Sequence, residues 1–137
     1  MTPAGHAFEE HTSEVRLRLW APSLAGLFVE AALALAELYA RQPAASTQVA
    51  SEPVSIEASD RDALLADWLN ELVYRTEASG HVYGSARLDA LTDRSLSGFV
   101  GQAQAPLPVT SIKAASMHGL HVLQTREGFT ATVILDV

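Results

Sequence analysis

Three carboxylates and a histidine lie close together near the start of the chain, at Glu9, Glu10, His11 and Glu14. Apolar and polar residues alternate directly after them, through residues 15–20, as in a half-buried strand. Carboxylates gathered where a strand begins can bind a hard cation, act as general acid or base, or simply be hydrated. The residue types favour hydration. In an extended strand His11 and Glu14 would also face opposite sides and could not serve one site without a bend.

A second group of oxygen ligands is expected at the other end of the sequence, where Asp136 precedes Val137 and its terminal carboxylate. Such a pair offers hard oxygen atoms within a short reach, the ligands that calcium, magnesium and manganese prefer. Taken alone, it is also the composition of an ordinary chain end. A metal site there requires the first and last strands to be neighbours, which the residue pattern does not decide.

Motifs for catalysis are weak. The G-x-S-x-G, H-E-x-x-H and glycine-rich phosphate-binding patterns are all missing from the sequence. His118, before Gly119, could act as a general base, although a histidine there more often fixes a bulge. Lys113, the only lysine, could lie near the acids or protect a sheet edge. These residues make a hydrolase the least favoured interpretation.

The segments that must position these residues predict an α+β domain. Apolar stripes at helical spacing predict one helix from a cap at Ser23 to a point before Pro43, and a second from a capping box at residues 59–62 to Gly80. Alternating patterns predict the strands. The first begins at Phe8 or Glu14 and ends at Trp20, and the others lie at residues 54–58, 82–90, 96–103, 112–117, 119–124 and 129–136. The expected order is β-α-β-α-β-β-β-β-β, mostly antiparallel, with both helices packed on one face.

Two details of this arrangement can be tested. Residues 1–7 are expected to be a flexible lead to a single domain that covers residues 1–137. In the second helix, Trp68 is expected in the core, whereas Asn70 and Glu71 are expected to hydrogen-bond to a neighbouring loop.

Composition narrows the class of protein. The chain has 137 residues, is 48% apolar and has a mean hydropathy of +0.13, which is enough for a core without disulfides. It has no cysteine, so thiolate metal sites and disulfide scaffolds are excluded. A formal net charge of −7 argues against a nucleic-acid-binding protein that acts alone. With no signal-peptide pattern and no long apolar stretch, a cytoplasmic protein is expected.

Four segments together resemble the archease family. Residues 10–14, EHTSE, are similar to its E-H-T-A-D opening. Residues 68–74, WLNELVY, are similar to its W-L-N-E-L-L-Y helix, and residues 112–120, IKAASMHGL, to its V-K-A-V-T-Y-H-G-L strand. Residues 133–137, VILDV, resemble its V-x-F-D-I terminus. The four segments occur in family order over nearly the whole chain, so the resemblance is specific.

The resemblance implies a small α+β protein that is not itself an enzyme. Archeases promote the guanylylation and repeated turnover of RtcB-type RNA ligases in tRNA splicing and RNA repair, so RNA would be met only through the ligase. Position by position, the family's metal site corresponds to Glu14, Asp136 and Val137. His11, Lys113 and His118 would be supporting or partner-contacting residues. Calcium is the expected ion, with manganese and magnesium as alternatives.

The sequence departs from the family pattern in two places. Glu14 stands where the family has an aspartate, and a longer, flexible carboxylate suits calcium or manganese better than magnesium. The loop at residues 101–110 carries no charge, although the family usually has acids and a histidine there. A general chaperone or protein-interaction module is therefore the alternative, with its exposed apolar surface on the alanine-rich first helix and the loop around Pro106.

Overall fold

The computed structural model describes residues 3–43 and 50–137. In chain order the structure is β-β-α-β-α-β-β-β-β-β. The elements are β1 (Gly5–Glu10), β2 (Glu14–Ala21), α1 (Leu24–Ala40), β3 (Glu52–Glu57), α2 (Arg61–Ser79), β4 (Tyr83–Leu91), β5 (Ser95–Gln102), β6 (Ala114–Ser116), β7 (Leu123–Thr125) and β8 (Gly128–Asp136).

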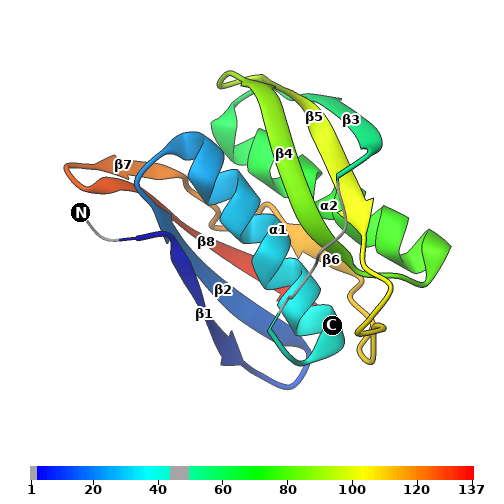
Figure 1. Cartoon of the computed structure of the whole chain (residues 1–137). Helices are drawn as coiled ribbons and strands as arrows, with labels where there is room; N and C mark the ends of the chain where they lie inside the picture. Colours follow the sequence, from blue (N-terminus) through cyan, green and yellow to red (C-terminus); the bar gives the residue numbers. More distant parts are fainter. Residues whose placement is uncertain (1–2, 44–49) are drawn as a thin grey trace.

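The strands form two antiparallel sheets (Figure 1). The larger has five strands in the order β1-β2-β8-β6, with β7 also paired to β8, and the smaller has the order β3-β5-β4. On β2, Val15, Leu17 and Leu19 are buried whereas Arg16 and Arg18 are exposed, so the helices cover one face of the larger sheet. The α+β class and the two helices on one face of a sheet are therefore confirmed.

The expected order lacked one strand, because residues 5–7 are not a flexible lead. They form the first half of β1, which pairs with β2 along its whole length, from Gly5 opposite Trp20 to Glu10 opposite Val15. The polar sequence GHAFEE hides this strand, since its inward-facing residues are His6 and Phe8 rather than two aliphatic residues. The expected flexible lead also included residues 1–2, which lie outside the described residues.

Both helices begin and end where local hydrogen bonding allows. The Ser23 hydroxyl accepts from the Gly26 amide at 3.0 Å, which caps α1 as expected. For α2 the cap is Asp60, whose carboxylate accepts from the Ala63 amide at 2.8 Å, one residue later than the predicted capping box. Gly80 ends α2 with φ 76°, a conformation that glycine adopts without strain. Neither helix of the described residues has the length and apolar character of a membrane span.

The C-terminal half contains less strand than the alternating pattern predicted. The expected strands at residues 112–117 and 119–124 shrink to the three-residue β6 and β7. A turn between them is closed by the Leu120 amide, which donates to the Met117 carbonyl at 3.1 Å. The Asp62 carboxylate then accepts from the Val122 amide at 2.8 Å, so a helix side chain replaces the strand partner that this amide would otherwise need.

The core is formed by buried residues of both helices and both sheets. Trp68 is fully buried, and its Nε1 donates to the Phe28 carbonyl of α1 at 2.8 Å, which joins the two helices. This confirms Trp68 as a core residue. The alanines of α1 after its first turn are buried too, and only Ala25 is exposed, so the alternative that assigned an exposed interaction surface to this helix is wrong. Burial of small side chains lets the helix approach its neighbours closely.

Candidate functional site: the strand ends that carry Glu14 and Asp136

The pairing of β2 with β8 brings the two ends of the sequence together. Glu14, the first residue of β2, lies directly opposite Asp136, the last residue of β8. Residues opposite each other in an antiparallel pair have Cβ atoms about 4.5–5.5 Å apart and point to the same face of the sheet. The sequence could not decide whether the first and last predicted strands are neighbours, and this register shows that they are.

Main-chain hydrogen bonds fix both strand ends. The turn between β1 and β2 is closed by the His11 amide, which donates to the Glu14 carbonyl at 2.9 Å. The Val137 amide donates to the Ser13 carbonyl at 3.1 Å, and the Lys113 amide donates to the Asp136 carbonyl at 2.8 Å. Val137 is partly buried against the core. The strand ends, defined here as Glu14, Asp136 and Val137, are thus held by the sheet rather than frayed.

Two carboxylates on one face and side by side repel each other unless a cation lies between them. Neither Glu14 nor Asp136 has an ion-pair partner within residues 3–43 and 50–137. Across the same residues, no three His, Asp or Glu side chains gather in a way that would hold a metal ion. The site provides two side-chain carboxylates, a partial set of hard oxygen ligands, so a divalent ion would need further oxygen atoms from the main chain or from water.

The other acidic residues of the N-terminal cluster are engaged elsewhere. Glu10 accepts from the Arg41 guanidinium at 2.6 Å on the helix side of the sheet. The Glu9 carboxylate lies 3.1 Å from His11 Nε2 on the opposite side. Alternation sends Glu10 to the helix side, whereas Glu9 shares the open face with Glu14 but lies beside Arg16 and His11.

The remaining predicted site residues lie near the strand ends without joining them. Lys113 contacts Asp136 only through its main chain, and its side chain is exposed. His118 lies in the turn after β6, where its amide donates to the Ser116 hydroxyl at 3.0 Å. Ser116 pairs with Ile134, two residues before Asp136, so the structure places His118 along the open side of the sheet. Neither residue is a ligand in this arrangement.

Two supporting residues hold the neighbouring segments. Asn70 binds the main chain of Ala115 twice: its Oδ1 accepts from the amide at 2.8 Å and its Nδ2 donates to the carbonyl at 3.0 Å. These two hydrogen bonds fix β6. They were predicted because Asn70 is a polar residue in the middle of a helix. Glu71 was expected to do the same, but it pairs with Arg75 of its own helix. Arg41, which the sequence did not suggest, joins Glu10 to the Thr110 hydroxyl.

His6 forms a second polar cluster, on the helix side of β1. Its Nδ1 lies 2.5 Å from the Glu30 carboxylate and its Nε2 lies 3.2 Å from the Glu37 carboxylate, both on α1. Burial lowers the pKa of His6, but the hydrogen bonds to Glu30 and Glu37 outweigh it and the net pKa is raised. The His6 ring therefore bridges two carboxylates of α1 and ties the edge strand to the helix.

Comparison with known proteins places this geometry in a family. Residues 6–137 match the Archease protein family (MTH1598/TM1083). The chain is 26% identical over 148 residues to "Protein archease" of Methanosarcina barkeri, with all of both chains covered. It is 30% identical over 138 residues to that of Methanopyrus kandleri, covering 93% of this chain and 96% of that one. The solution structure of Methanobacterium thermoautotrophicum protein 1598 superposes with a TM-score of 0.70 at 26% identity, covering 97% and 99% of the two chains.

Proposed function

Because the chain belongs to the archease family, we propose that it is a non-catalytic cytoplasmic partner of an RtcB-type RNA ligase. It would promote guanylylation of the ligase and its repeated turnover. The observation that carries the proposal is the register of β2 and β8, which sets Glu14 opposite Asp136 at one end of the larger sheet. A pair of like charges with no cationic partner among the described residues is a structure suited to receiving a cation.

The ion would be held by the Glu14 and Asp136 carboxylates and by a main-chain oxygen of Val137. Once bound, a divalent ion supplies positive charge that offsets the charge of phosphate groups. The protein's own contribution is to present these oxygen atoms on a rigid edge. The sheet hydrogen bonds at Ser13, Lys113 and Val137 hold their positions before the ligase is met, so little conformational entropy is lost on binding.

The ion is expected to be calcium, with manganese second. Glu14 is one methylene longer than aspartate, and calcium accepts flexible, bidentate carboxylates at longer distances than magnesium does. The replacement Glu14→Asp should therefore shift the preference toward magnesium. Isothermal titration calorimetry of both forms with the three ions measures this directly, and an unchanged order of affinities would contradict the role given to Glu14.

The uncharged loop before β6 is bound to the C-terminal end of α1. The Val109 and Thr110 amides both donate to the Tyr39 carbonyl at the end of α1, at 2.8 and 3.2 Å. Leu107 and Val109 are 54% and 71% exposed. Their exposure supports the part of the interaction-module alternative that assigned an apolar surface to this loop. We propose that the loop contacts the ligase through apolar side chains where other archeases use charged ones.

Guanylylation of a cognate ligase tests the proposal. Radiolabelled GTP and catalytic amounts of ligase are incubated with wild type, Glu14→Gln or Asp136→Asn, and labelled ligase is quantified over time. The matched control is Asp67→Asn, which removes the same charge from an exposed position on α2 that has no hydrogen bond or ion pair with the described residues. Stimulation by wild type and Asp67→Asn but not by the other two is expected. Equal stimulation by all four would refute the role of the strand ends.

A further inference from the structure

The face of the larger sheet that the helices leave open has its own chemistry. Glu14, Arg16, Arg18 and Trp20 project from β2 on this face, because the residues between them are buried on the other. Thr130, Thr132 and Ile134 alternate in the same way on β8, which runs alongside. The open face is defined here as these side chains of β2 and β8. It begins at the strand ends of the proposed metal site and extends toward the β7–β8 hairpin.

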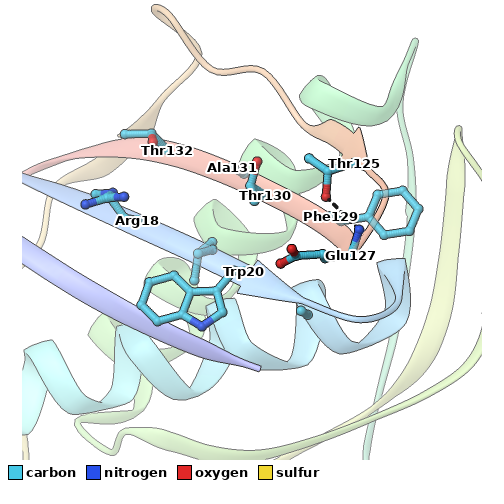
Figure 2. Close-up of a pocket in the computed structure, with 10 residues that line it drawn as sticks. Arg18, Trp20, Thr125, Glu127, Phe129, Thr130, Ala131 and Thr132 are labelled. Atoms are coloured by element: carbon cyan, nitrogen blue, oxygen red, sulfur yellow. Dashed lines mark hydrogen bonds between the residues drawn. The ribbon is translucent and has the colours of Figure 1, made fainter. Parts of the chain in front are cut away.

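Two hollows lie end to end on the open face. The first, of about 490 Å³, is lined by Arg18, Trp20 and the side chains of the β7–β8 hairpin (Figure 2). The second, of about 500 Å³, lies nearer the strand ends and includes Arg16, Arg18 and His118. Arg18 and Thr132 line both. Together the hollows form a track along the strands that is longer than either one alone.

The middle of the track is cationic, although the protein carries a net charge of −7. Arg18 is exposed and makes no hydrogen bond or ion pair with any described residue. Arg16 lies 3.9 Å from Glu9, a loose contact between two exposed groups. Glu127 lines the first hollow and Glu9 lines the second, beside Arg16. Arg18, in the centre of the track, therefore offers a free guanidinium group to an anionic ligand.

The spacing of these side chains has the period of an extended chain. Residues two apart on a strand are about 7 Å apart, so Arg16, Arg18 and Trp20 form a regular row. That interval is close to the separation of consecutive phosphates in an extended polynucleotide strand. The Trp20 indole lies flat against Gly5 of β1, where a Cβ atom would come within 2.8 Å of the ring. Its position is therefore fixed, as a surface for base stacking must be.

We propose that the open face holds a single-stranded segment of RNA while the ligase acts on the end of that strand. Arg16 and Arg18 contact successive phosphates, Thr130 and Thr132 donate hydroxyl hydrogen bonds, and Trp20 stacks on a base. This inference rests on the proposed function, because it is docking of the strand ends at the ligase that would bring the RNA alongside. Without the ligase, the overall negative charge keeps the interaction weak, and salt weakens it further.

An acidic peptide is the competing occupant, since it would also pair with the two arginines. The row of side chains favours RNA, because it combines guanidinium groups at one repeat with an aromatic surface and hydroxyl donors. A peptide carboxylate uses the first of these only. The two ligands therefore predict different effects of removing the indole: Trp20→Leu should weaken binding of RNA and spare binding of an acidic peptide.

Photocrosslinking in the assembled complex tests this inference. RNA that carries 4-thiouridine near its reacting end is bound to ligase plus wild type, Arg18→Gln, Trp20→Leu or Arg87→Gln, then irradiated, and crosslinked peptides are identified by mass spectrometry. Arg87→Gln is the matched control, an exposed arginine that pairs with Asp89 on the smaller sheet. Crosslinks on β2 and β8 that fall several-fold in the first two variants, but not in the control, are expected.

The outcomes separate this inference from the proposed function. Guanylylation requires no RNA, so failure of wild type to stimulate it would overturn the proposed function directly. Stimulated guanylylation with crosslinks absent from the open face, or equal in all four proteins, would overturn the RNA inference alone. Competition by polyglutamate as strong as by unlabelled RNA, or retained binding by Trp20→Leu, would identify an acidic protein segment as the occupant and would likewise overturn it.

Discussion

The replacement Asp136→Asn is expected to change stability in opposite directions with and without a divalent ion. Without one, the Asp136 carboxylate lies opposite that of Glu14 and repels it. With one, both carboxylates become ligands and the same carboxylate stabilises the fold. Asparagine keeps the size and one oxygen atom of the side chain, so the change removes charge with little effect on packing.

The size of each effect follows from the register. Two unit charges about 5 Å apart in a water-like dielectric repel by about 1 kcal/mol at low salt. For a chain of 137 residues this corresponds to about 3 °C in Tm. An ion present at a hundred times its Kd stabilises the fold by about 2.7 kcal/mol, or about 9 °C on the same scale. Asp136→Asn should therefore raise Tm in EDTA and lower it, relative to wild type, in calcium.

Differential scanning calorimetry at low ionic strength measures the Tm in EDTA and in calcium on the same protein preparations. Asp67→Asn serves as the control, because it removes one exposed acidic charge that has no hydrogen bond or ion pair with the described residues. It should shift Tm equally in EDTA and in calcium. A calcium-dependent rise in Tm that is the same in Asp136→Asn and wild type would show that Asp136 is not a ligand. A fall in Tm without metal would show that the two carboxylates do not repel.

Two further replacements probe the parts that support the site. Asn70→Ala removes both hydrogen bonds to the Ala115 main chain and should lower the free energy of unfolding by about 2 kcal/mol in urea denaturation. His6→Gln tests the bridge to Glu30 and Glu37. Because the pKa of His6 is raised in the folded protein, the bridge stabilises fully below the unfolded pKa of about 6.5 and is lost as pH rises through the folded value. The variant should therefore lose more stability at pH 6 than at pH 9.

Each of these predictions has an internal check. Asn70→Asp keeps the size of the side chain but sets a second acceptor oxygen against the Ala115 carbonyl, so it should cost at least as much as Asn70→Ala; a much smaller loss would mean that packing, not hydrogen bonding, fixes β6. For His6→Gln, a loss of stability that does not vary between pH 6 and pH 9 would show that the bridge does not depend on protonation.

Helices were the part of the fold that the sequence predicted best, because their signals are local. The cap at Ser23, the stop at Gly80 and the apolar stripe of each helix act within a few residues of chain. Trp68 and Asn70 could also be assigned from position alone, since one large apolar and one amide side chain within the same helix must face different surroundings.

Strands that depend on distant partners were predicted less well. The strand β1 was missed because its inward residues, His6 and Phe8, become suitable for a core only when α1 lies over them. The strands β6 and β7 were predicted too long, because alternation shows which residues could form a strand and not where a partner ends. Asp62 of α2 satisfies an amide that a longer β7 would have paired.

The sequence by itself predicted the residues of the candidate site, through segments at the two ends of the chain that resemble those of archeases, and it grouped Glu9, Glu10, His11 and Glu14 as one cluster. Only the tertiary structure decided which of them meet. The alternation of β1 and β2 sends Glu9 and Glu10 to opposite faces, and the pairing of β2 with β8 sets Glu14 against Asp136. Pairing between strands more than a hundred residues apart depends on the whole core, and no local stretch of sequence specifies it.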